Sequence, residues 1–268
     1  MDSFTWIYLL DSSTFICFAA VLGLVCGSFY AVCIHRYITN ESLVFPPSHC
    51  PHCKARLRPW ELIPVISWLC LRGRCGHCGK AIHWRYPLIE LLSAVLAALL
   101  AWKFGASLAF VVFFVAAGAC IVASGIDIAL FILPDAITLG GAVLALPAAI
   151  WLLDMPWQLV LSGGLGGAGV FWLVLTLFKK ARGKEGMGMG DVKLMLPIGF
   201  LCGGLMLPLV VLAAGLGALC YLLPQALLGK DIRTLRIPFG PFLCFGFLLT
   251  VLAGQEISQW WFAFVTGH

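Results

Sequence analysis

The chain has 268 residues, of which 62% are hydrophobic and 11% are charged, and its mean hydropathy is +1.01. A water-soluble domain of this length carries far more polar surface, so these values exclude an ordinary soluble enzyme. The formal net charge is +5. Because the basic residues cluster in a few polar loops, we interpret this charge as a signal of membrane orientation, and we expect no nucleic-acid partner.

Apolar runs of about 20 residues recur along the chain and predict an all-α polytopic membrane protein with about eight transmembrane helices. The expected spans are residues 13–34, 87–102, 108–126, 136–153, 158–178, two short helices within 192–228, and 242–264. Gly203, Gly204 and Pro208 mark the expected turn between the two short helices. In the fifth span, small residues predict close packing against another helix: Gly163, Gly164, Gly166, Gly167 and Gly169.

The basic residues predict the orientation of these spans. Of the 17 Lys and Arg residues, eight lie in 36–85, five in 179–193 and three in 230–236, which leaves only Lys103. The positive-inside rule places those three loops on the cytoplasmic side. We therefore expect a multi-pass membrane protein, surrounded by lipid, with both termini outside.

Two carboxylates are expected at one level of the membrane, because Asp127 follows the third span and Asp191 precedes the sixth. Three alternating glycines in Gly186–Lys193 permit close backbone approach before Asp191. Each acid alone could lie in a solvated turn, and Asp191 could be a helix N-cap. Together they could share one proton, so that one activates a water and the other protonates a carbonyl, as in aspartic proteases. Asp127, expected at a helix C-terminus, is the predicted proton carrier.

Two further acids have simpler interpretations. Asp135 directly follows Pro134 and is expected in the first turn of a helix. Glu90 lies near the start of the second span and is expected to pair with Arg85.

Four of the 12 cysteines form two Cys-x-x-Cys pairs in one polar loop, with 21 residues between them. This spacing predicts a four-thiolate zinc site, and the expected cytoplasmic location disfavours disulfides. The expected ligands are Cys50, Cys53, Cys75 and Cys78. A closed shell of four sulfurs leaves no position for water, so the predicted zinc is structural and orders a small, zinc-ribbon-like cytoplasmic loop domain. His52 and His77 are expected on the surface of that loop.

Six motifs in order resemble the type IV prepilin peptidases, which are bifunctional leader peptidase/N-methyltransferases. The similar segments are Gly27-Ser28-Phe29 with His35-Arg36; Ser48–Cys53; Ile63-Pro64-Val65 with Ser67-Trp68, Arg72–Cys75 and Arg85-Tyr86-Pro87 with Glu90; Asp127 with Leu133-Pro134-Asp135; Glu185–Lys193; and Ile237–Phe242. Ala31 and Leu62 depart from the family pattern, which usually has Asn at both positions.

The resemblance implies an aspartic endopeptidase of the bacterial inner membrane that cuts type IV prepilins or pseudopilins after a glycine at the cytoplasmic face. It also implies N-methylation of the new N-terminal residue, usually Phe, with S-adenosylmethionine as methyl donor. Asp127 and Asp191 are then the catalytic pair. The supporting residues implied by the motifs are Asp135, Glu185, Gly188, Gly190 and Lys193.

We divide the chain into a first transmembrane helix (1–35), a zinc-binding loop associated with methylation (36–86) and a transmembrane peptidase core (87–268). The rival interpretation is a non-enzymatic transporter or secretion-assembly scaffold with a zinc-ordered docking loop. In that case the two aspartates would relay protons or cations. A relay should place its acids at mid-membrane, whereas these two are expected at one edge.

Overall fold

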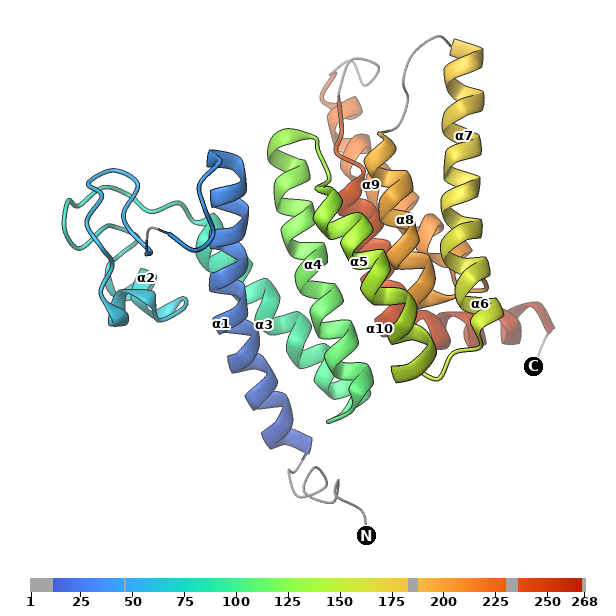
Figure 1. The fold of residues 1–268 in the computed structure, drawn as a ribbon, viewed down its shortest axis with the longest axis horizontal. Helices are drawn as coiled ribbons and strands as arrows, with labels where there is room; N and C mark the ends of the chain where they lie inside the picture. Colours follow the sequence, from blue (N-terminus) through green and yellow to red (C-terminus); the bar gives the residue numbers. More distant parts are fainter. Residues whose placement is uncertain (1–11, 46, 183–187, 230–235, 267–268) are drawn as a thin grey trace. The chain divides into compact units, whose positions relative to one another are not determined.

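A computed structural model of the chain describes residues 12–45, 47–182, 188–229 and 236–266, and within these residues the fold is helical, with two isolated β-bridges (Figure 1). Seven of the described helices are long and apolar enough to cross a membrane. The prediction of an all-α polytopic membrane protein is therefore confirmed. The chain forms two compact units, Met1–Val122 and Ala123–His268.

The first unit is built on a close pair of membrane helices. Its elements are α1 (Ser12–Thr39), η2 (Pro59–Leu62), α2 (Ile66–Cys70), α3 (Arg85–Phe104) and the first part of α4 (Leu108–Leu130). A Cβ atom at Gly27 would lie 2.7 Å from the Cα of Glu90, so only glycine lets α1 approach α3 this closely. The long polar segment between α1 and α3 is expected and found.

The second unit contains the end of α4 and the remaining helices. These are α5 (Asp135–Pro147), the π-helical η3 (Ala148–Leu152), α6 (Trp157–Leu161), the π-helical η4 (Ser162–Gly166), α7 (Gly167–Arg182), α8 (Met189–Cys202), α9 (Leu207–Leu227) and α10 (Gly240–Thr266). The expected turn within residues 192–228 is confirmed, because α8 ends before Gly203, which has φ +71°, and α9 begins at Leu207.

Helix α8 is the central helix of this unit and packs against α5, α6, η4, α7 and α10 (Figure 1). Helix α8 is also apolar, but at 14 residues it is shorter than each of the seven candidate spans. Its close packing depends on glycine: Gly163 of η4 meets the backbone of Gly199, and Gly164 meets the ring of Phe200. The glycines of the fifth span thus allow close packing against another helix, as predicted, and that helix is α8.

The first and third spans end later than predicted. Helix α1 continues to Thr39, past the expected end at residue 34. The break between the third and fourth spans was expected at Asp127–Asp135, but α4 continues to Leu130. Phe131 then adopts a left-handed conformation, with φ +57°, and its N–H donates to the Asp127 carbonyl at 2.8 Å. Asp127 therefore lies in the last turn of a helix and not in a turn after it.

Candidate active site and metal centre

The two predicted catalytic carboxylates come together in the second unit. Asp127 and Asp191 are only 5% and 6% exposed, and they are close enough for the charge of one to act on the other. Asp127 comes from the end of α4 and Asp191 from the third residue of α8. Buried like charges this close cannot both ionise freely, so the pair can hold one proton between two carboxyl groups.

The Asp127 carboxylate is held by the start of another helix. The backbone N–H of Gly240, the first residue of α10, donates to Asp127 Oδ2 at 3.1 Å. A Cβ atom at Gly240 would lie 2.7 Å from the same oxygen. The motif Ile237–Phe242 was singled out only by resemblance, and the structure shows that it delivers this amide. The contact could not be predicted from the sequence, because the donor is a backbone N–H and no side chain of the motif indicates it.

Asp191 is held by the start of its own helix. Gly188 is the N-cap of α8, so the interpretation of Asp191 as an N-cap is wrong. The backbone N–H of Gly188 donates to the Asp191 carboxylate three residues later. Each carboxylate therefore lies at a helix N-terminus, where negative charge is favoured. We had predicted Asp127 as the proton carrier because it was expected at a helix C-terminus and Asp191 at a helix N-terminus. Since both carboxylates accept an N–H from the start of a helix, this difference is smaller than expected, and the assignment stays a prediction.

Leu133 lies beside both glycine-bearing segments of the site. A Cβ atom at Gly190 would be 3.0 Å from the Leu133 Cβ, and one at Gly240 would be 3.1 Å from its Cδ2. Leu133 is 7% exposed. It therefore packs between the starts of α8 and α10, and both helices need glycine to approach it. We predicted no role for Leu133 from the sequence, although it lies in the Leu133-Pro134-Asp135 motif.

The supporting residues fall into three groups. Asp135 is the first residue of α5, as expected, and its Oδ1 pairs with Lys193 Nζ at 2.7 Å. The side chains of this pair are 61% and 32% exposed, so the pair faces outward. Gly188 and Gly190 contribute the backbone positions described above. Glu185 lies outside the described residues.

The four predicted zinc ligands of the first unit meet at one point. Their Sγ atoms all lie within 4.8 Å of one another, and Cys50 and Cys78 are separated by 3.9 Å. Tetrahedral zinc with Zn–S bonds of about 2.3 Å requires sulfur atoms about 3.8 Å apart, so the cluster fits the ion. Burial opposes ionisation of the Cys50 thiol, but backbone hydrogen bonds from Cys53 and His52 and side-chain bonds with Cys75 and Cys53 lower its pKa to about 7.

The two Cys-x-x-Cys segments form matching knuckles. In the first, the N–H of Cys50 donates to the Ala55 carbonyl at 3.0 Å. In the second, the N–H of Cys75 donates to the Lys80 carbonyl at 2.8 Å. A left-handed residue follows each pair: Lys54 with φ +57° and Gly79 with φ +69°. Such paired knuckles are the zinc-ribbon-like feature that the sequence predicted. His77 pairs with Glu61 at 3.6 Å between Nε2 and Oε2.

Glu90 connects α3 with α1 and the loop. Its Oε2 accepts the N–H of Val65 at 2.7 Å, and its carboxylate also accepts a bond from the Ser28 hydroxyl. Glu90 makes no ion pair with Arg85 in the described part of the chain, so that expected pair is wrong. The residues that replace it are Ser28 of the first motif and Val65 of the loop, which only the folded chain brings together.

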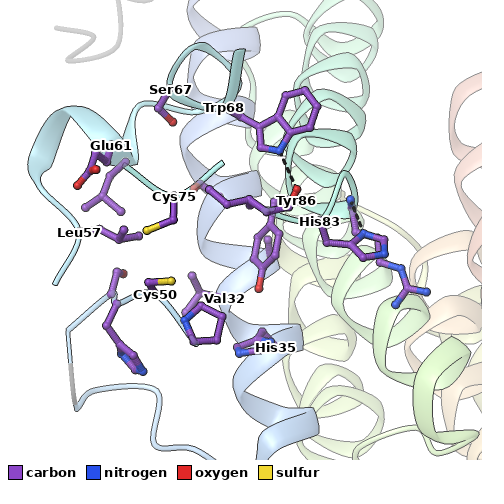
Figure 2. A pocket seen from close by; sticks show the side chains of 18 of the residues that line it. Val32, His35, Cys50, Leu57, Glu61, Ser67, Trp68, Cys75, His83 and Tyr86 are labelled. Atoms are coloured by element: carbon purple, nitrogen blue, oxygen red, sulfur yellow. Dashed lines mark hydrogen bonds between the residues drawn. The ribbon is translucent and has the colours of Figure 1, made fainter. Parts of the chain in front are cut away.

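A cavity of about 540 Å³ lies beside the knuckles, within the first unit (Figure 2). Cys50 and Cys75 reach its wall from the loop, and Val32 and His35 line it from α1. Aromatic side chains, among them Trp68 and Tyr86, and the buried Glu90 also line it. The cavity is large enough for a cofactor-sized molecule.

The fold and the two candidate sites thus define a polytopic membrane protein that has buried paired carboxylates in one unit and a four-cysteine cluster in the other. Residues 21–104 match the Bacterial Peptidase A24 N-terminal domain, and residues 114–223 match the Type IV leader peptidase family. The chain belongs to the type IV leader peptidase family, as its motifs predicted.

Several similar proteins carry the name Prepilin leader peptidase/N-methyltransferase. That of Pseudomonas putida is 37% identical over 94% of this chain and 96% of its own length. Those of Burkholderia pseudomallei strain 1026b and Pseudomonas aeruginosa are 37% and 34% identical, covering 88% and 93% of this chain and 85% and 94% of their own lengths. No solved structure matches the chain. The predicted class of enzyme, a prepilin peptidase with N-methyltransferase activity, is confirmed by the family and these names. The helices and the relatives also support a multi-pass inner-membrane protein.

Proposed function

We propose that this protein cleaves the leader of type IV prepilins or pseudopilins after a glycine, at the cytoplasmic face of the membrane, and methylates the new N-terminal residue. The observation that carries the proposal is the buried Asp127–Asp191 pair, in which each carboxylate accepts a backbone N–H. Asp191 adjoins, in the sequence, one of the three loops that hold 16 of the 17 basic residues, and the positive-inside rule favours the cytoplasmic side for these loops.

The proposed cleavage needs no metal at the carboxylates. The ionised member of the pair takes a proton from a water molecule, whose oxygen attacks the carbonyl carbon of the scissile bond. The protonated member gives its proton to the carbonyl oxygen, which leaves a tetrahedral intermediate with two hydroxyl groups. As this intermediate collapses and the C–N bond breaks, the carboxyl group that took the water proton gives it to the leaving amine, and the other carboxylate takes a hydroxyl proton, so that the pair again holds one proton. The N–H groups of Gly240 and Gly188 keep both carboxylates oriented throughout.

The zinc that fits the four cysteines has a different role. Cys50, Cys53, Cys75 and Cys78 would fill all four positions of the ion. The ion would supply structure and no bound water, because a closed shell leaves no open position. It would tie the two knuckles together and so shape one wall of the cavity, to which Cys50 and Cys75 contribute.

The cavity is the best-supported place for methylation. It is lined by the aromatic Trp68 and Tyr86, the carboxyl groups of Glu41 and Glu90, and apolar side chains such as Val32. Aromatic faces and carboxylates suit a ligand with a planar base and a cationic centre. S-adenosylmethionine has both, and its sulfonium would supply the methyl group. Methylation and cleavage would then use residues of different units.

The decisive experiment incubates the purified protein with a prepilin and S-adenosylmethionine and analyses the product by mass spectrometry. The wild-type protein should give a shortened, N-methylated product. Asp127→Asn and Asp191→Asn should each give no detectable cleavage, because the pair needs one ionisable and one protonated oxygen. Asp154→Asn, which removes a carboxylate outside the pair, is the matched control. Full cleavage by either pair variant at normal expression would refute the aspartic mechanism.

The rival transporter function makes a different prediction for the same carboxylates. A relay would need Asp127 and Asp191 to exchange protons or cations between the two sides of the membrane. Both residues instead lie at helix ends. Proteoliposomes containing the wild-type protein should therefore show no ion flux that Asp127→Asn or Asp191→Asn removes. Such a flux, in the absence of prepilin cleavage, would favour the transporter.

A further inference from the structure

Glu90 is a buried carboxylate whose charge has no cationic partner among the residues that the structure describes. Its exposed fraction is 7%, and within the described residues no Lys, Arg or His lies within ion-pair distance of it. Its bonded neighbours, the Val65 N–H and the Ser28 hydroxyl, are neutral. A carboxylate offers about four acceptor positions, so two donors leave part of this capacity unused.

The structural role of Glu90 does not require a charge. A glutamine carbonyl could accept the same bonds from Val65 and Ser28 without the desolvation cost of a buried carboxylate. An ionisable side chain within a membrane helix is costly, and such groups mark functional sites by default. The unused acceptor capacity of Glu90 faces a cavity, since Glu90 and Ser28 both line it.

The chemistry of the cavity limits what the ligand can be. Beside Glu90 the cavity is lined by Ser28 and by the apolar Ala31, Val32 and Ile89, whereas the basic His35, Arg36 and Arg85 line it further along α1 and α3. A ligand that satisfies the surface around Glu90 has a cationic group attached to an apolar body. The newly exposed end of a peptide, an α-ammonium group beside an apolar first side chain, has this form.

We propose that Glu90 is the binding site for the α-ammonium group of the peptide whose N-terminus is methylated. This inference rests on the proposed methylation in the first unit. The Val65 N–H and the Ser28 hydroxyl hold the carboxylate in one orientation, from the loop and from α1 respectively. Val65 itself has φ +61°, a strained conformation for a β-branched residue, and the 2.7 Å bond to Glu90 contributes to holding it. Loop and membrane helices thus meet at the carboxylate that receives the substrate.

The test measures peptide binding without a methyl donor. Purified full-length protein in detergent is titrated with a fluorescent peptide that begins with Phe, either with a free N-terminus or with an acetylated one. The wild-type protein should bind the free form about tenfold more tightly, because only this form carries the ammonium group. Glu90→Gln should bind both forms equally and weakly. Glu90→Asp should recover part of the preference, and Asp154→Asn should retain all of it.

Fold is checked by gel filtration and zinc content, so that a variant that merely unfolds is recognised. A preserved preference for the free N-terminus in folded Glu90→Gln would overturn the inference, as would equal binding of both peptides by the wild-type protein. A parallel arm compares S-adenosylmethionine with its neutral demethylated product. If Glu90→Gln removes this discrimination and leaves the peptide preference unchanged, the carboxylate serves the methyl donor and the inference fails. Absence of methylation by the wild-type protein would instead refute the proposed function.

Discussion

The backbone N–H of Gly240 donates to Asp127 Oδ2 across 3.1 Å, although the two residues are 113 positions apart in the chain. The bond joins the first residue of α10 to the last turn of α4. Because the donor belongs to the main chain, it remains in place whatever side chains surround it. The orientation of the Asp127 carboxylate is therefore set by the backbone of another helix.

Gly240→Ala should lower kcat for prepilin cleavage by about 100-fold, because misplacement of a reacting group by about 1 Å has such an effect. The added Cβ atom would lie 2.7 Å from Asp127 Oδ2 and 3.1 Å from Leu133 Cδ2, so α10 or Asp127 must move. The matched control is Gly215→Ala on α9, where an added Cβ meets nothing within 4 Å and kcat should stay unchanged. Wild-type kcat in folded Gly240→Ala would contradict this role.

Asp135→Asn should be far milder than replacement of either buried aspartate. Asp135 pairs with Lys193 on an exposed surface, and such pairs contribute about 0.2–1 kcal/mol. We expect Asp135→Asn and Lys193→Gln to lower kcat/KM by less than about tenfold each. A double-mutant cycle on cleavage rates measures the coupling between the two. Loss of cleavage in Asp135→Asn as complete as in Asp127→Asn would place Asp135 in the reaction itself.

Replacement of Cys50 and Cys53 by Ser should release the zinc and reduce methylation much more than cleavage. Two of the four ligands are then lost, and with them the link between the knuckles. Zinc is measured by elemental analysis, and both products are measured by mass spectrometry. Cys70→Ser is the control, because Cys70 is an exposed cysteine of the same polar segment outside the cluster. Undiminished methylation in a zinc-free variant would contradict the role of the loop.

The proposed orientation predicts where reporter domains are active. Alkaline phosphatase, which folds only outside the cytoplasm, should be active when fused after Lys103 and inactive when fused after Lys54 or Lys180. The reason is that Lys103 is the one basic residue outside the three basic loops. Activity of the Lys180 fusion would put the segment before α8 outside. That result would be incompatible with cleavage at the cytoplasmic face.

The sequence predicted the helices well because their signals are local. Apolar runs, Gly203-Gly204 and the paired cysteines each act within a few residues, and the structure places all of them as expected. The boundary at Asp127 failed because the helix continues past a charged residue. Hydropathy treats that charge as the end of a span, whereas the buried carboxylate is accommodated by Gly240 from a distant segment.

The contacts that position the candidate site could not be predicted, since they join segments far apart in the chain. Leu133 between Gly190 and Gly240 is one example, and the bond from Val65 to Glu90 is another. In each case at least one partner is a glycine or a backbone N–H, which has no chemical signature of its own. Resemblance marked these segments as important without indicating what they touch.

The enclosure of α8 also bears on how the protein tolerates different membranes. At 14 residues and about 1.5 Å per residue, α8 is about 21 Å long, shorter than a hydrocarbon layer of about 30 Å. Because neighbouring helices surround it, its length need not match the lipid. A thicker or thinner bilayer would tilt the outer helices first, while Asp191 would keep its place relative to the helices packed against α8. The position of the Asp191 carboxylate should therefore depend little on the acyl-chain length of the lipids.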